Sequence, residues 1–176
     1  IYCLIYQGKM QVGSGLAANE VLAGASVLGR PAEEFVNDAS VEIMWAVKAH
    51  EHAEVYFNIL CSVDPVTLKL TKIDDEIYAD FRKNFPTFKL DSLDEEALKS
   101  EAAKEQWRPF CERYEHKVEE FNFASLVRID ASGDYDPENT ILVTRIQFLA
   151  IEIGRCREGK NSSVRDKFKP SPRVKS

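Results

Sequence analysis

The sequence predicts a mainly helical protein with a single folded domain and at most one small β-hairpin. Two segments, 41–63 and 73–85, repeat apolar residues with the period of a helix that faces a core, and a third, 145–157, is apolar nearly all round the helix axis. Strand-like segments do not alternate with helical ones, which argues against an α/β fold built on a parallel sheet. With 176 residues, of which 44% are apolar, the chain has enough material for one core.

The first helix is expected over 41–63, after two residues that favour the N-cap position. Asp64 and Pro65 then predict a short helical turn over 66–70, because aspartate caps a helix and proline fits its first position. The apolar residues that we expect to face the core from the first helix are Val41, Met44, Trp45, Val55, Tyr56, Ile59, Leu60 and Val63.

Two further helices are expected in the middle of the chain. Thr71 and Asp74 resemble a capping box that opens the first of them, and Pro86 ends it. The second helix is expected over roughly 93–121. Pro109 lies inside this stretch and predicts a kink or break just before it, because proline removes a backbone hydrogen bond and clashes with the preceding turn.

The C-terminal half predicts a hairpin followed by the most apolar helix. Segments 123–130 and 140–143 look like strands, joined by a turn rich in Gly, Asp and Pro. The helix expected over 145–157 is apolar nearly all round, which places it in the middle of a bundle. The large side chains that we expect to be buried are Trp45, Tyr56, Phe81, Trp107, Phe110, Phe148 and Ile151.

Composition divides the chain into three parts. Residues 1–30 are expected to be a mostly disordered extension, 31–160 a single helical domain, and 161–176 a basic flexible tail. Residues 1–153 hold 15 Lys and Arg against 27 Asp and Glu, whereas 154–176 hold 8 against 2. The acidic body should repel nucleic acid, so we expect no direct nucleic-acid binding.

The cysteines and the apolar runs indicate the compartment. No run of apolar residues is long enough to cross a membrane, and the N-terminal one does not resemble a secretory signal. The cysteines lie far apart and form no metal-binding pair, so Cys61, Cys111 and Cys156 are expected to be free thiols. We expect a monomer in the cytoplasm, or in both cytoplasm and nucleus, whose native start is Met10.

Two short motifs resemble functional sites but lack the context that those sites need. Residues 13–18 match the glycine-rich dinucleotide fingerprint, yet neither a strand before them nor a βαβ unit after them is evident. His50 and His52 resemble a metalloprotease helix, but the position that needs the second histidine is Glu54. No nucleophile signature occurs. The sequence therefore predicts no catalytic residue, no metal site and no cofactor.

Charged residues around the most apolar helix are the more informative candidates. Arg145 and Glu152 are seven residues apart, hence on one helix face, and charges on a buried helix must be paired or line a cleft. An internal ion pair and a groove that binds a partner are both open at this point. We expect His52 to be partly buried.

Several motifs together resemble one eukaryotic family. They include Trp45-Ala46, His52-Ala53-Glu54-Val55-Tyr56, Ser62-Val63-Asp64-Pro65, Phe81-Arg82-Lys83-Asn84-Phe85, Trp107-Arg108-Pro109-Phe110-Cys111 and Arg145-Ile146-Gln147-Phe148. Over residues 28–160 the chain resembles the polysaccharide-biosynthesis-domain-containing protein family of small cytosolic proteins. The resemblance implies a compact orthogonal helical bundle.

The resemblance also implies a function. The family is described as a chaperone that helps translation elongation factor one alpha to fold its GTPase domain, and an acidic surface suits such a basic client. A non-enzymatic binding protein for this GTPase is therefore the expected function. The alternative is an enzyme or accessory factor of polysaccharide biosynthesis, of the transferase type, which the family name suggests.

Matched motif residues that packing explains least are candidates for the client surface. We expect Arg108, beside Pro109, and the end of the last helix to form or border that surface. The candidates are Lys104, Arg108, Arg155, Arg157 and Glu158. The alternative is that Arg108 and Arg155 pair with nearby glutamates and only hold helices together.

Overall fold

The structure, a computed structural model, describes residues 39–168 of the chain. The chain divides into two compact units, 1–46 and 47–176, and only the start of one helix is described in the first unit. This division differs from the single domain expected over 31–160. The expected N-terminal disorder, the start at Met10 and the glycine-rich motif lie outside the described residues.

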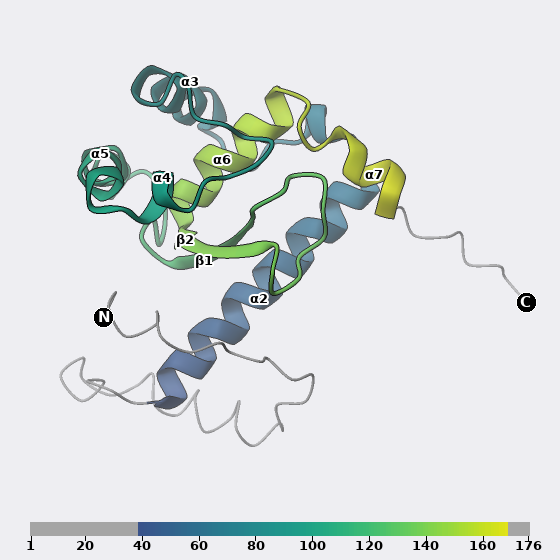
Figure 1. The fold of residues 1–176 in the computed structure, drawn as a ribbon, viewed down its shortest axis with the longest axis horizontal. Helices are drawn as coiled ribbons and strands as arrows, with labels where there is room; N and C mark the ends of the chain where they lie inside the picture. The colour runs from purple at the N-terminus through teal and green to yellow at the C-terminus, as the bar shows by residue number, and fades with distance from the viewer. Residues whose placement is uncertain (1–38, 169–176) are drawn as a thin grey trace, which may run out of the picture. The chain divides into compact units, whose positions relative to one another are not determined.

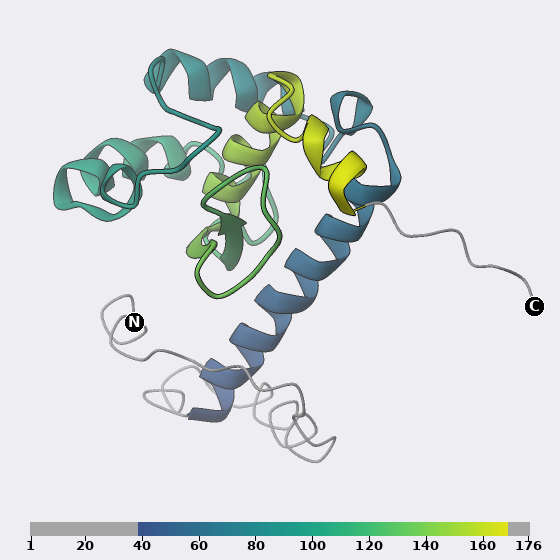
Figure 2. The same cartoon turned by 45° about the vertical axis from the view of Figure 1, so that its right-hand side comes forward.

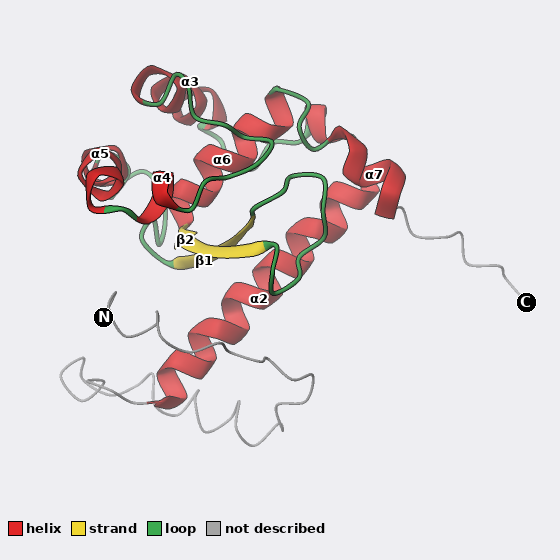
Figure 3. Ribbon diagram, viewed as in Figure 1, coloured by secondary structure: helices red, strands yellow, loops and turns green. Residues whose placement is uncertain are grey.

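Six α-helices and one antiparallel hairpin form residues 39–168 (Figure 1, Figure 3). In chain order they are α2 (Ala39–Ser62), the 3-10 turn η2 (Pro65–Thr67), α3 (Asp74–Asn84), α4 (Glu96–Lys99), α5 (Glu101–Glu112), β1 (Ala124–Arg128), β2 (Thr140–Thr144), α6 (Arg145–Arg157) and α7 (Ser162–Phe168). The expected mainly helical fold with a small hairpin is confirmed. The orthogonal crossing of the helices stays a prediction.

Local capping explains where the early elements begin. The Asp64 side chain accepts a hydrogen bond from the Val66 backbone N–H at 3.1 Å, with Pro65 in the first position of η2. The Asp74 side chain accepts from the Thr71 N–H at 2.7 Å, but Asp74 is the first residue of α3, and the N-cap residue is Ile73, whose side chain makes no capping hydrogen bond. The start signal at Asp64 therefore acts as the sequence predicts, whereas Thr71 is not the cap of α3.

The helix expected over 93–121 is instead two helices, and the break falls at Ser100 rather than at Pro109. The Ser100 hydroxyl accepts a hydrogen bond from the Ala103 N–H at 3.1 Å and caps a new helix. α5 continues through Pro109 because Pro109 and Glu105 are both exposed, so water can bond the carbonyl that proline leaves unpaired.

The hairpin leads straight into the most apolar helix. β1 and β2 pair antiparallel, with Ala124 opposite Thr144 and Arg128 opposite Thr140. Thr144 ends β2 and also caps α6, where its side chain accepts from the Gln147 N–H while the Gln147 side chain accepts from the Thr144 N–H at 3.0 Å. This reciprocal pair fixes the direction in which α6 leaves the hairpin.

α6 is the central helix of the unit that begins at residue 47. All its residues from Ile146 to Cys156 are buried, and it contacts α3, η2 and both strands. Figures 1 and 2 show α3 and α5 on one side of it and α2 on the other. The expected buried side chains are confirmed except Trp45, which is only half-buried because it precedes Ala49, where the core begins.

The chain turns back after α6, so the tail expected over 161–176 is wrong for its first part. Gly159 adopts a φ of +69°, and the Lys160 N–H donates to the Arg155 carbonyl at 2.8 Å, which closes a Schellman-type end. This reversal buries Asn161, and α7 then buries Val164. Residues 169–176 lie outside the described part of the chain.

Truncation tests this correction. A chain that ends at Asn161 loses α7 and the buried Val164, so we expect its free energy of unfolding to fall by about 1.5–3 kcal/mol. A chain that ends at Phe168 retains both and serves as the control. Urea unfolding followed by circular dichroism measures the difference. Equal stability of the two truncated chains would contradict a structural role for α7.

Candidate functional site

Three charged side chains meet in the core and form what we call the buried ion cluster: Arg128, Glu152 and Arg155. Arg155 Nη1 lies 2.7 Å from Glu152 Oε1, and Arg128 Nη2 lies 3.5 Å from Glu152 Oε2. None of the three side chains has any exposed surface. Two cations therefore share one carboxylate, which makes Glu152 indispensable to the balance of charge.

Hydrogen bonds from other elements complete the cluster. Tyr56 donates its hydroxyl to Glu152 Oε2 at 2.8 Å, and Asn161 donates to the same oxygen at 2.9 Å. Arg155 donates from Nε to the Leu90 carbonyl at 2.7 Å. The cluster consequently links α2 and α6 to the segments that contain Leu90 and Asn161.

The environment fixes the protonation of the cluster. Burial alone would raise the pKa of Glu152, but the charges of Arg155 and Arg128, with hydrogen bonds from Asn161 and Arg155, lower it below its ordinary value. Burial and the neighbouring Glu152 raise the pKa of Tyr56. The carboxylate is therefore ionised and the phenol protonated, an arrangement that holds helices together.

The cluster corrects two sequence predictions and confirms one. Glu152 is a buried ion-pair residue, as expected. Its partner is Arg155, not Arg145, because seven residues of helix place two side chains about 10 Å apart along the axis. Arg155 is fully buried, so its assignment to a client surface is wrong. Arg128 is a member of the cluster that the sequence patterns do not predict; its signal is an arginine at the end of an apolar strand.

Two of the remaining candidates lie at the exposed end of α6. Arg157 pairs with Asp75 and lies over the Tyr78 ring at 5.0 Å. Glu158 forms a salt bridge with Arg82 at 2.6 Å. All these partners belong to α3, so both residues hold α3 against the end of α6, and they remain accessible to a partner.

The other two candidates lie on α5. Lys104 pairs with Glu101 at 2.7 Å, and Arg108 is exposed one turn further along. Among residues 39–168, no hydrogen bond or ion pair links them to Arg157 or Glu158. The structure thus leaves two separate exposed groups, and the client surface expected there stays a prediction.

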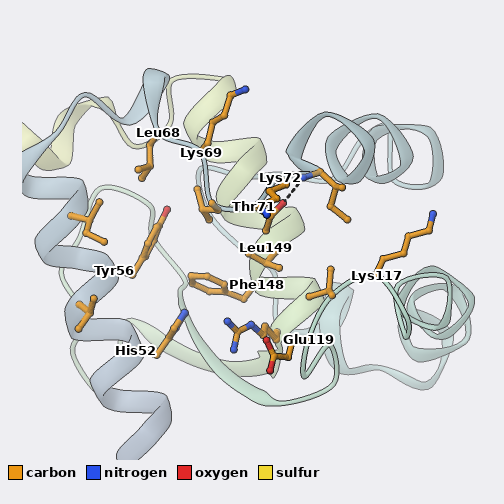
Figure 4. Close-up of a pocket in the computed structure, with 16 residues that line it drawn as sticks. His52, Tyr56, Leu68, Lys69, Thr71, Lys72, Lys117, Glu119, Phe148 and Leu149 are labelled. Atoms are coloured by element: carbon orange, nitrogen blue, oxygen red, sulfur yellow. Dashed lines mark hydrogen bonds between the residues drawn. The ribbon is translucent and has the colours of Figure 1, made fainter.

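An open groove of about 540 Å³ lies between α2 and the start of α6 (Figure 4). The 68–73 segment and the 117–119 turn close its other sides. Figure 4 shows His52 and Tyr56 projecting from α2 toward Phe148. Edge-on ring contacts, 5.0 Å from His52 and 5.1 Å from Tyr56 to Phe148, bridge the two helices at the base of the groove.

Apolar side chains line the α2 side of the groove and are open to solvent. Val55 is 60% exposed and Ile59 is 39% exposed, and both line the groove. Val63, the first residue after α2, is also 39% exposed and follows Ile59 at the same spacing of four. The expectation that these three face the core is wrong: Tyr56 and Leu60 are the ones that do.

The edge of the groove is rich in cations. Lys69, Lys72, Lys117 and Arg145 line it, against the single carboxylate Glu119. Lys117 pairs with Glu76, and Arg145 with Glu120 at 3.3 Å. Among the residues that the structure describes, no carboxylate forms an ion pair with Lys69 or Lys72. These two lysines therefore offer charge to a ligand.

His52 is half-buried in the base of this groove, as expected. Burial, with a smaller contribution from the charge of Arg145, lowers the pKa of His52. Its Nδ1 is buried and has no hydrogen-bond partner among the described residues. The ring is consequently neutral at pH 7 and contributes contact area rather than charge.

Other kinds of site find less support. Between residues 39 and 168, no three His, Cys, Asp or Glu side chains converge as metal ligands, and no helix combines the length and apolar character needed to span a bilayer. Cys61, Cys111 and Cys156 are free, as expected, and burial raises the pKa of the Cys111 thiol to about 11.

The fold and the site define a class of protein: a mainly helical body, stabilised by a buried ion cluster, with an open apolar groove. The chain belongs to the PBDC1 protein family, whose sequence pattern matches residues 41–166. The resemblance noted from the motifs is therefore confirmed.

Individual relatives agree with this assignment. Protein PBDC1 from Homo sapiens is 54% identical over 147 residues, which cover 84% of this chain and 63% of the human protein. The PBDC1 homolog from Schizosaccharomyces pombe is 44% identical over 138 residues, 76% of this chain and 94% of that one. The chain thus matches less than two thirds of the human protein's length.

A solved structure supports the fold itself. The solution NMR structure of protein yst0336 from Saccharomyces cerevisiae superposes with a TM-score of 0.70 at 42% sequence identity. The match covers 78% of this chain and 97% of that one. At this identity the helical body and its hairpin are a shared architecture.

Proposed function

We propose that this protein is a non-enzymatic binding protein that assists the folding of a translation elongation factor GTPase domain. The observation that carries the proposal is the open groove, with apolar residues of α2 exposed along it. A protein that binds an unfinished domain must offer apolar surface to a core that is not yet closed.

Two further features support a binding role. The hydrogen bond from Tyr56 of α2 to Glu152 of the buried ion cluster links α2 to α6, so the two helices that line the groove are held in place. The acidic body attracts a basic client such as a tRNA-binding GTPase during encounter, because complementary charge raises the rate of association. The elongation factor itself comes from the family resemblance.

An assay of the folding of newly synthesised elongation factor tests the proposal. Elongation factor one alpha is synthesised in a cell-free system with and without the full chain, and its protease-resistant, GTP-binding fraction is measured. We expect the wild-type chain to raise this fraction and Val55→Asp to remove most of the gain, because a carboxylate in the groove opposes apolar contact.

The matched control is Val66→Asp. Val66 is 56% exposed, like Val55, but it does not line the groove. Both variants should unfold within about 0.5 kcal/mol of wild type, since both positions are on the surface. Charge reversal of Arg108 and Arg157 in the same assay tests the surfaces predicted from the sequence.

Two results would contradict the proposal. The first is an unchanged folded fraction of the elongation factor when the wild-type chain is added. The second is a large thermal stabilisation of this chain by a nucleotide sugar or a methyl donor, which would favour the transferase alternative, because a ligand that binds the native state raises its stability.

A further inference from the structure

We infer that the groove selects an acidic amphipathic segment, in which apolar side chains alternate with carboxylates, from its client. The inference rests on the proposed function, because the occupant is taken to be part of the client. It adds the chemistry of the bound segment, which neither the fold nor the family assigns. Three properties of the groove lead to it: the apolar side chains that line it, the two lysines on the 68–73 segment and a further cation, Arg145, at the start of α6.

The base of the groove indicates which apolar groups the bound segment should carry. His52 and Tyr56 each contact Phe148 edge-on at its base, where Phe148 and Tyr56 are buried. The apolar surface that is open to a ligand is that of exposed Val55 and Ile59 along α2. Side chains such as leucine or phenylalanine are the groups that remove most apolar surface from water at such a site.

The edge of the groove indicates which charged groups the bound segment should carry. Lys69 and Lys72 lie on the 68–73 segment and form no ion pair within residues 39–168, although the charge of Lys69 acts on Asp75. Arg145 lines the opposite side, where its one partner, Glu120, is at 3.3 Å and exposed. Carboxylates that flank an apolar anchor can therefore meet a cation on either side, whereas a basic segment would meet like charge.

The acidic net charge of the protein does not cancel this preference. Screening at physiological salt limits interactions between exposed charges to about 8 Å, so a bound segment is affected mainly by the groove's own residues. The acidic surface outside the groove can meet basic parts of the client while the groove holds an acidic segment of it. The two effects act on different parts of the client.

The chain's own C-terminal residues do not match the groove. Residues 169–176 contain Lys169, Arg173 and Lys175 and no carboxylate side chain. Lys69 and Lys72 would repel such a segment. The charge of the edge therefore favours a segment of another protein over this one.

Fluorescence anisotropy with two synthetic peptides tests the inference. Both peptides carry leucine at the same positions of an amphipathic pattern and a fluorescein label, and the other positions are glutamate in one and lysine in the other. We expect the full chain to bind the acidic peptide at least about tenfold more tightly than the basic one, and added salt to weaken the acidic complex.

Charge-reversed variants locate the preference. Lys69→Glu/Lys72→Glu should remove or invert it, whereas Lys89→Glu/Lys160→Glu should leave it unchanged. The control has the same change in total charge at two exposed lysines outside the groove. Thermal unfolding of both variants checks that they are folded.

Each outcome separates this inference from the proposed function. If the wild-type chain assists the elongation factor but binds both peptides equally, the inference is wrong and the proposed function stands. If it prefers the acidic peptide but does not assist the elongation factor, the inference is supported and the proposed function is wrong. A dimer in light scattering that dissociates when the acidic peptide binds would assign the groove to a second copy and overturn the inference.

Discussion

Replacing Glu152 with glutamine should lower the free energy of unfolding by about 3–5 kcal/mol, the largest electrostatic effect that we expect in this protein. Glutamine retains the size of the side chain and can still bond Tyr56 or Asn161. Within residues 39–168 it removes the carboxylate that forms ion pairs with both Arg128 and Arg155, so two guanidinium groups remain buried without an ion-pair partner. Urea unfolding of the two proteins gives the difference directly.

Two controls distinguish a lost charge from a lost contact. Arg128→Met keeps a long side chain and leaves Glu152 paired with Arg155, so we expect it to cost less than the loss of Glu152. Glu105→Gln removes an exposed charge and should change stability by less than about 0.5 kcal/mol. A loss in Glu152→Gln no larger than that in Glu105→Gln would show that the cluster does not stabilise the fold.

Lowering the pH should also show how much the Glu152 carboxylate contributes to the free energy of unfolding. The folded-state pKa of Glu152 lies below its unfolded value of about 4.3, so its contribution is present above that pH and is lost as the pH falls through the folded-state pKa. The wild-type chain should therefore lose more stability on acidification than Glu152→Gln. Unfolding curves of both proteins between neutral pH and pH 3 measure this difference.

The regular elements could be predicted because local chemistry specifies them. The helix at 145–157 is apolar on every side, and the segments before it alternate as strands do, so α6 and the hairpin follow from the sequence. The sequence does not predict the break at Ser100, because proline is a stronger general helix breaker than serine. The helix continues past Pro109 because this residue is exposed to solvent, and no local pattern in the sequence reveals that exposure.

The site could be predicted only in part, because it depends on which face of each helix is covered. A valine on an amphipathic helix gives the same signal whether it packs in the core or lines a groove, and Val55 and Ile59 were therefore assigned to the core. The same limit applied to Arg155, since a charge on a buried helix is compatible with an ion pair or a cleft. The structure shows an ion pair, since Arg155 is buried against Glu152 at 2.7 Å.

Replacing Trp107 with alanine should cost about 3–5 kcal/mol, because the side chain is the centre of the aromatic cluster between α3 and α5. Only 2% of Trp107 is exposed, and its ring stacks on Phe85 with centroids 4.1 Å apart and lies edge-on to Phe110 at 5.5 Å. α3 and α5 share no buried ion pair like that of α6, so rings supply most of their contact. The cavity left by the indole cannot collapse easily between rigid neighbours.

Trp107→Phe separates the two contributions of the indole. Phenylalanine retains a ring against Phe85 but loses the hydrogen bond that Nε1 donates to the Ala97 carbonyl at 3.1 Å. We expect this variant to cost about 1–3 kcal/mol, well below the alanine variant, since most of the packing persists. Similar losses in both variants would mean that the hydrogen bond to α4, rather than ring packing, holds α5 in place. In that case the short helix α4 would be the element that positions α5, and Ser100 would act as the joint between them.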